Sequence, residues 1–192
     1  PEAGSDFLAL LGIWIDYKMQ VEALSRRQLR RWCEDRFLSP TRMREWDDLH
    51  RQLHKAIRER GYVVNAQPAD RDQIHKALLS GLLGNIARRD EHGFYRGTRD
   101  RVVAIWPASR LARTKARWIM AAELTETTRL FARHVSEIEP EWIAEVASHQ
   151  LRYDHSEAHW STKRECVLAF ESVSLWGLPV IAGRPIDYAT VE

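Results

Sequence analysis

The sequence predicts an α+β protein, with an N-terminal helical bundle, then a small β-barrel, then a short strand-rich C-terminal extension. In roughly the first 80 residues, apolar residues recur at helical spacing behind N-capping residues. The chain then breaks into short apolar runs separated by basic turns, and the turns contain Gly81, Gly84, Gly93 and Gly97. Strand-like runs return near the C-terminus. These shifts divide the chain into residues 1–80, 81–147 and 148–192.

Two helices in the N-terminal part have specific start signals. Ser25 stands three residues before Gln28, which is the spacing of a capping box. Ser39 precedes Pro40, so an N-cap is followed by the residue favoured at the first helical position. The first helix is expected to bury four side chains, namely Leu29, Trp32, Cys33 and Phe37. The second is expected to continue until Gly61.

The remaining elements follow from periodicity and turn residues. Further helices are expected over residues 5–20, 70–82 and, more briefly, 140–146. Residues 118–138 leave helix and strand both open, because threonine, phenylalanine and valine favour a strand whereas alanine, glutamate and leucine favour a helix. The polar residues 149–165 are expected to be a connection. Short strands are expected after it, over residues 167–170, 173–176 and 180–181.

The segment from Arg88 to Arg117 is the most basic part of the chain. It contains nine lysine or arginine residues and three acidic ones. By contrast, residues 136–192 contain four basic and ten acidic residues, so a net charge of +2 conceals a basic middle and an acidic end. A basic patch rich in arginine indicates a polyanion, with nucleic acid as the first candidate. The alternative is a solvated surface that happens to be rich in arginine.

Several classes of site are not indicated by any motif. The chain has no phosphate-binding loop, no H-E-x-x-H and no G-x-S-x-G, so we expect no catalysis by this chain alone, no catalytic residue and no metal site. No apolar run is long enough for a membrane span, and the first residues lack the basic region of a signal peptide. Cys33 and Cys166 are expected to stay unpaired, which suits a cytoplasmic location.

Five long segments carry a family resemblance. They are SDFLALLGIW (5–14), LRRWCEDRFLSPTRMREWDDLHRQL (29–53), HKALLSGLLGNIARRD (75–90), WIMAAELTETTRLFARHVSEIEPEWIAEVA (118–147) and SEAHWSTKRECVLAFESVSLWGLPV (156–180). In this order they resemble the C-terminal part of bacterial HrpA-like DEAH-box ATP-dependent RNA helicases. The last segment resembles the start of the extension that these enzymes carry beyond the common helicase core.

The resemblance implies a role for each part of the chain. Residues 1–80 would be a helix-rich accessory domain, and residues 81–147 an oligonucleotide-binding (OB) fold, whose strands would include most of residues 118–138. Residues 148–192 would begin the C-terminal extension. The motor domains, their nucleotide-binding loop and the DEAH box do not occur in this sequence, nor does a winged-helix segment. ATP and magnesium are therefore expected for the motor domains of the parent protein and not for this chain.

The expected ligand is single-stranded RNA, held beside the motor domains of the same parent chain. OB barrels combine a basic groove with aromatic side chains on which bases stack. Trp118 is expected in the core, and Tyr95 is the preferred stacking residue. Arg99 and Arg101 would share one face if the chain there is extended. The turn over residues 107–109 would offer backbone amides and the Ser109 hydroxyl to phosphate, with a plain turn as the alternative. The full set of candidates is Arg88, Arg89, Tyr95, Arg96, Arg99, Arg101, Ser109, Arg113, Lys115 and Arg117. A protein-docking or structural module is the alternative function.

Overall fold

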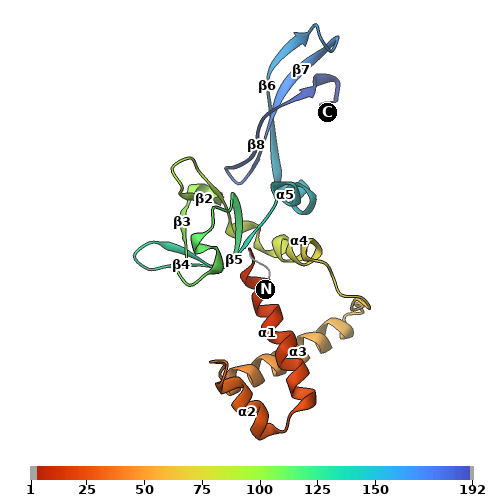
Figure 1. Cartoon of the computed structure of the whole chain (residues 1–192). Coiled ribbons are helices and arrows are strands. Elements are labelled where there is room, and N and C mark those ends of the chain that lie inside the picture. Colours follow the sequence, from red (N-terminus) through yellow and green to blue (C-terminus); the bar gives the residue numbers. More distant parts are fainter. Residues whose placement is uncertain (1–3, 191–192) are drawn as a thin grey trace. The chain divides into compact units, whose positions relative to one another are not determined.

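A computed structural model describes residues 4–190 of the chain (Figure 1). These residues form two compact units, a helical unit of residues 8–70 and a second unit of residues 4–7 and 71–190. The predicted domain boundaries after residues 80 and 147 stay predictions. The outermost positions of the first and last predicted domains, 1–3 and 191–192, lie outside the described residues.

The helical unit contains most of α1 (Asp6–Ala23) together with α2 (Arg26–Glu34) and α3 (Pro40–Glu59). The predicted start signals are confirmed. The amide of Ser25 donates to Gln28 Oε1 at 3.0 Å, and the amide of Gln28 donates to Ser25 Oγ at 3.5 Å. Ser39 Oγ accepts from the amide of Arg42. Each start therefore follows from local chemistry, since the capping side chain satisfies an amide that the first turn leaves unpaired.

The core of the helical unit is small and aromatic. Tyr17, Cys33 and Met43 are buried, with partly buried apolar side chains around them. Among these, Trp14 and Trp46 have ring centroids 5.1 Å apart. Phe37, expected in this core, is instead 99% exposed and has a positive φ of 57°. The prediction was wrong because α2 ends at Glu34, so Phe37 no longer follows the helical periodicity.

The second unit is built on a closed barrel with strand order β1-β2-β3-β5-β4. The strands are β1 (Ile86–Arg89), β2 (Tyr95–Gly97), β3 (Val102–Ile105), β4 (Trp118–Glu126) and β5 (Leu130–Glu137). β3 and β5 run parallel, and β1 closes the barrel by pairing antiparallel with β4. Residues 118–138 are thus mainly two strands, as the family resemblance implied.

Alternation along β4 supplies two separate cores. Ile119 and Ala121 point into the barrel, where they join Ala87, Val103 and other small or branched side chains. Trp118 and Met120 point outward. Because side chains alternate across a strand, a nearly continuous apolar run buries both of its faces.

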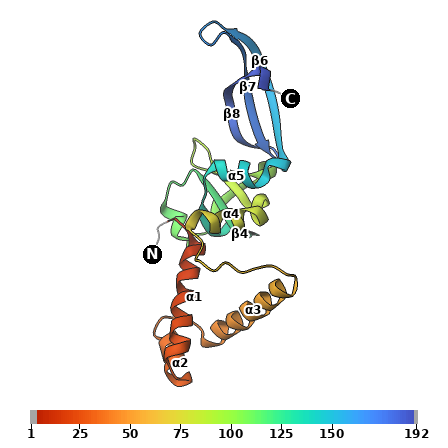
Figure 2. The same cartoon turned by 90° about the vertical axis from the view of Figure 1, so that its right-hand side faces the viewer.

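The outer core is covered by two helices and the end of the chain. α4 (Arg71–Leu82) and α5 (Pro140–Ala147) lie side by side against the barrel (Figure 2). Leu175, Leu178 and Val180 pack into the same core. They come from a second sheet with strand order β6-β7-β8, formed by β6 (Leu151–Ser161), β7 (Cys166–Leu175) and β8 (Leu178–Asp187).

The C-terminal part is more regular than expected. The predicted connection over residues 149–165 is wrong, because most of it forms β6. β6 is an edge strand whose residues from Arg152 to Trp160 are all exposed, so it lacks the apolar alternation that marks a half-buried strand. The expected turn at Gly177 is confirmed, since this glycine joins β7 to β8 with a φ of 84°.

Candidate nucleic-acid interface

One outer surface of the barrel collects aromatic side chains. In β3, Val103 and Ile105 contribute to the inner core, so Val102 and Ala104 point outward. Ala104 is paired with Phe131 of β5. Trp106 continues the β3 line, and its amide donates to the carbonyl of Ala132 at 2.9 Å. We call the surface formed by Val102, Ala104, Trp106, Phe131 and Arg133 the β3 face.

Arg133 lies against the aromatic part of the β3 face. Its guanidinium carbon is 4.1 Å from the Trp106 ring centroid, and the Trp106 and Phe131 centroids are 5.1 Å apart with an edge-to-face angle of 83°. Nη1 of Arg133 is 3.8 Å from a Glu123 carboxylate oxygen, and its Nε atom is buried without a hydrogen-bond partner among the described residues. The β3 face therefore combines ring surface with a guanidinium that lies over the Trp106 ring.

Phe94 is the most exposed aromatic residue of the barrel, at 58%. It ends the turn between β1 and β2, which Asp90 organises by accepting hydrogen bonds from the amides of His92 and Phe94 at 3.0 and 2.9 Å. Burial opposes ionisation of Asp90, but those two amides and the Arg96 guanidinium outweigh it and hold the carboxyl pKa below its usual range. The next residue, Tyr95, pairs with Val103 in β3. The register therefore leads from Phe94 toward Ala104 of the β3 face.

Four cations lie around one end of the barrel and form what we call the basic rim, namely Arg89, Arg113, Lys115 and Arg117. The amide of Arg89 donates to the carbonyl of Arg117 at 2.8 Å, so these two residues are neighbours although they lie on different segments. The side chains of Arg113, Lys115 and Arg117 are exposed, and none has an ion-pair partner within the described part of the chain. The positive charges of these side chains are therefore not neutralised by ion pairs within the described part of the chain.

The structure corrects the role predicted for Tyr95. Its side chain is only 7% exposed and belongs to the barrel core, and its hydroxyl donates to the carbonyl of Ala116 at 2.8 Å. Desolvation accordingly raises the pKa of the phenol. A buried ring has no free face for a base, so the predicted stacking role is wrong. Phe94, one residue earlier, has the opposite orientation and the exposure that stacking requires.

The side chains of two further candidates, Arg101 and Ser109, already form hydrogen bonds within the fold. Arg101 donates from Nε to the carbonyl of Thr98 at 3.2 Å and from Nη2 to the carbonyl of Gly84. The Ser109 hydroxyl donates to Asp6 at 2.6 Å and accepts from the amide of Leu111 at 3.1 Å. Both side chains therefore act first as structural links, and the predicted phosphate contact of the Ser109 hydroxyl is not supported by this geometry.

The shared face expected for Arg99 and Arg101 is also wrong. Residues 98–100 form a 3-10 turn in which Arg99 and Asp100 both have positive φ values, 59° and 54°. The chain is not extended there, so the alternation argument does not apply. The side chain of Arg99 is exposed, while its amide donates to the carbonyl of Trp176 at 3.0 Å.

Arg88 and Arg96 lie opposite each other on β1 and β2. Arg96 is 3.2 Å from Asp90 and 3.5 Å from Asp100, so two carboxylates already neutralise it. Arg88 donates to the carbonyl of Pro179 at 3.4 Å. The ten predicted residues therefore do not form one patch, and the four side chains of the basic rim have no ion-pair partner among the described residues.

Sequence reasoning missed Phe94, Phe131 and Arg133 as candidate site residues. The sequence prediction relied on the density of positive charge between positions 88 and 117. That range does not include β5, and a charge criterion selects arginine rather than aromatic residues. Alternation along β3 and β5 would have identified the outward positions, but only once their parallel pairing was known. That pairing joins strands separated in the chain by β4.

Neither a metal-binding cluster nor a membrane-spanning helix is found among the described residues. Residues 4–190 contain no group of three or more histidine, cysteine or acidic side chains arranged to hold a metal. None of the helices in that range is long and apolar enough to cross a bilayer.

Relatives of the chain are RNA helicases. It is 42% identical over 189 residues to the "ATP-dependent RNA helicase HrpA homolog" of Haemophilus influenzae and 40% identical to the Escherichia coli "ATP-dependent RNA helicase HrpA". Each alignment covers 98% of this chain but only 14% of the relative. The Schizosaccharomyces pombe "Pre-mRNA-splicing factor ATP-dependent RNA helicase prp22" is 28% identical over 83% of this chain and 13% of its own length.

A protein family and a solved structure also match the barrel and its surroundings. Residues 74–151 match the family described as "Oligonucleotide/oligosaccharide-binding (OB)-fold". The crystal structure of the E. coli DExH-box NTPase HrpB resembles 77% of this chain, over 18% of its own length, with a TM-score of 0.51 and 16% identity, which supports the fold alone. The predicted resemblance is therefore confirmed: the chain is similar over 98% of its length to a segment of HrpA-type RNA helicases, and its residues 74–151 match an OB fold.

Proposed function

We propose that this chain binds single-stranded RNA on its barrel and does so beside the motor domains of an HrpA-like parent protein in the cytoplasm. In OB folds generally, the face of the second and third strands and the loops after the first and fourth strands receive oligonucleotides. Here those positions are the β3 face, the turn that ends at Phe94, and residues 127–129 between β4 and β5. The exposed Phe94 ring beside the β3 face is the observation that carries the proposal.

The aromatic and the basic residues would make different contacts with the RNA. Phe94 supplies a flat, solvent-facing ring, and Trp106 and Phe131 extend the apolar surface toward Arg133. Base stacking on aromatic rings tolerates every base, so this surface favours single strands with little sequence preference. The basic rim supplies phosphate contacts, which depend on salt. The free thiols of Cys33 and Cys166 suit the cytoplasmic setting.

Phe94→Ala tests the stacking part. We expect a loss of about 1–3 kcal/mol in binding free energy for a fluorescein-labelled oligouridylate, with the salt dependence unchanged. Phe37→Ala is the matched control, because Phe37 is also an exposed phenylalanine but lies in the helical unit. Equal affinities of Phe94→Ala and the parent would refute stacking at this position.

The salt dependence of the parent protein tests the electrostatic part. With three or four phosphates contacted, log K plotted against log salt concentration should have a slope of roughly −2 to −3. A flat response would reject RNA binding through the basic rim and favour the alternative of a protein-docking module.

A further inference from the structure

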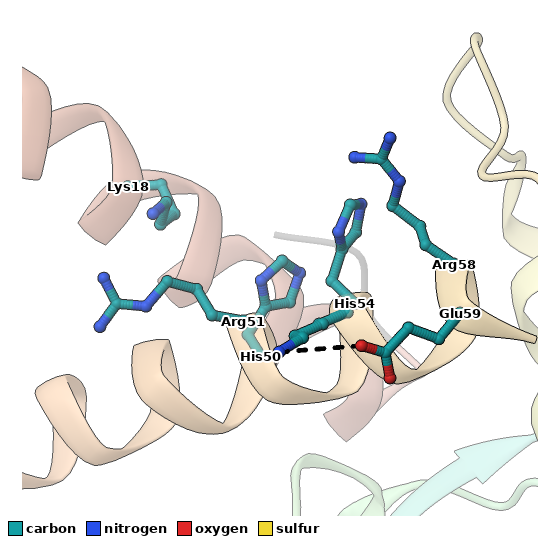
Figure 3. A pocket seen from close by; sticks show the side chains of 7 residues that line it. Lys18, His50, Arg51, His54, Arg58 and Glu59 are labelled. Carbon is teal, nitrogen blue, oxygen red and sulfur yellow. Dashed lines mark ion pairs between the residues drawn. The ribbon is translucent and has the colours of Figure 1, made fainter.

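The helical unit has a basic groove of its own, between α1 and α3. It has a volume of about 490 Å³ and is lined by Lys18 from α1 and by residues from the second half of α3 (Figure 3). His50, His54 and Arg58 follow at intervals of four along α3 and therefore share one side of the helix. At 1.5 Å per residue this row extends for about 12 Å, enough to follow more than one phosphate of a strand.

Packing in the aromatic core holds the groove in place. The Trp14 ring lies 5.0 Å from the His50 ring, and Lys18 Nζ lies 5.6 Å from the Trp14 centroid. Lys18 also pairs with Asp47 of α3 at 2.9 Å. These contacts join α1 to α3 at the base of the groove.

The charges in the groove are unequally matched. Lys55 lies 3.7 Å from Glu59, the ion pair drawn in Figure 3. Among the described residues, His50, His54 and Arg58 have no acidic partner. The side chains of His54 and Arg58 project from the same side of α3 (Figure 3). An anion entering the groove would therefore find hydrogen-bond donors that no carboxylate occupies.

An exposed aromatic residue continues this surface. His54 and Arg58 also line a second hollow, together with Tyr62, Val63 and Val64. Tyr62 is 67% exposed, and its amide donates to the carbonyl of Ile57 at 3.2 Å, which holds the residue close to the end of α3. A row of hydrogen-bond donors that includes an arginine, next to a solvent-facing ring, is the combination that binds the phosphates and a base of a single strand.

We infer that this groove is a second binding site for a single-stranded polynucleotide, separate from the barrel, with phosphates on His50, His54 and Arg58 and a base on Tyr62. A metal ion is the competing ligand, since two histidines four residues apart on a helix are able to share one. The charges around the two rings oppose that choice, because the groove is lined by four cations, Lys18, Arg51, Lys55 and Arg58, and by one carboxylate, that of Glu59.

The test compares two charge reversals on α3 in the whole 192-residue chain, with oligouridylate affinity measured by fluorescence anisotropy. Arg58→Glu should weaken binding at least several-fold and flatten the slope of log K against log salt by about 0.7 or more. Arg42→Glu is the matched control, because Arg42 is exposed on the same helix, pairs with Glu45 and lies outside the groove. Equal losses in the two variants, or no loss in Arg58→Glu, would overturn the inference.

A second pair of variants tests the base contact, and a circular dichroism spectrum of each variant checks the helices. Tyr62→Ala should weaken binding with an unchanged salt slope, and Tyr62→Phe should retain the affinity of the parent because the ring remains. A folded Tyr62→Ala protein that binds normally would overturn the base contact. Arg58→Gln repeats the charge test if Arg58→Glu does not fold.

Histidine side-chain NMR signals distinguish the two possible ligands. His50→Gln and His54→Gln identify the two imidazole signals, and inorganic pyrophosphate should shift both in the parent protein. A response to zinc without a response to pyrophosphate would replace the anion site by a metal site. The barrel is tested separately. Weaker binding in Phe94→Ala but not in Arg58→Glu would reject the groove site and leave the barrel site standing. The reverse result would reject the barrel site and leave the groove site standing.

Discussion

In the barrel, Arg96 and Arg101 contact carboxylates and carbonyls of their own fold, whereas in the helical unit Arg58 and His54 line a groove without an acidic partner among the described residues. The barrel segment has the higher density of positive charge along the chain. The comparison shows that density and availability differ, because a small barrel with tight turns has many backbone carbonyls to satisfy. Arginine, with five donors, is well suited to that structural task.

The contrast between adjacent aromatic residues gives the largest expected effect. Tyr95→Ala removes a buried ring and its bond to the Ala116 carbonyl, and it should lower the free energy of unfolding by about 3–5 kcal/mol. Phe94→Ala should change it by no more than about 0.5 kcal/mol, since Phe94 is exposed. Urea unfolding followed by far-ultraviolet circular dichroism measures both. Similar stabilities would contradict the assignment of Tyr95 to the core.

The same contrast applies to arginines. Arg101→Ala leaves the carbonyls of Thr98 and Gly84 without their donor and should cost about 1–3 kcal/mol of stability. Arg113→Ala should cost no more than about 0.5 kcal/mol, because its exposed side chain has no ion-pair partner in the described part of the chain. Thermal melts of the two variants measure this difference. Equal melting midpoints would contradict the structural role of Arg101.

Loss of charge from the basic rim should change binding and leave stability almost unaltered. With Arg113, Lys115 and Arg117 all replaced by alanine, the salt slope for oligouridylate should flatten by about two units, at roughly 0.7 per phosphate contact. The melting midpoint should stay close to that of the parent. A triple variant with the parental salt slope would remove these residues from the proposed interface.

The smallest expected effect is the contribution of Asp90 to stability at different pH values. The pKa of Asp90 is lowered in the folded protein, so its contribution to stability is present above the unfolded-state pKa of about 4 and is lost as pH falls through the folded value. Asp90→Asn should therefore be slightly less stable than the parent at neutral pH, and the difference should shrink below pH 4. A difference that grows in acid would show that Asp90 does not act through its charge.

Much of the fold was predictable because its signals are local. The Ser25 capping box and the Ser39-Pro40 start each involve residues within one helical turn, and both are confirmed. Residues 118–138 were ambiguous by composition, because β4 buries both faces and therefore lacks alternation. The family resemblance resolved that ambiguity, and the barrel confirms it. β6 escaped prediction for the opposite reason, since its residues from Arg152 to Trp160 are all exposed.

The sequence by itself determined the fold class, the helix starts, the basic middle of the chain and the relation to HrpA-like helicases. Only the tertiary structure decided which of the basic and aromatic residues face solvent. Ser109 is bound by Asp6, 103 positions away. The β3 face exists only because β3 pairs directly with β5, although β4 separates the two strands in the chain. Such partners are selected when the whole core closes. A charge or a ring that looks available along the chain is therefore assigned to structure or to surface only in the folded protein.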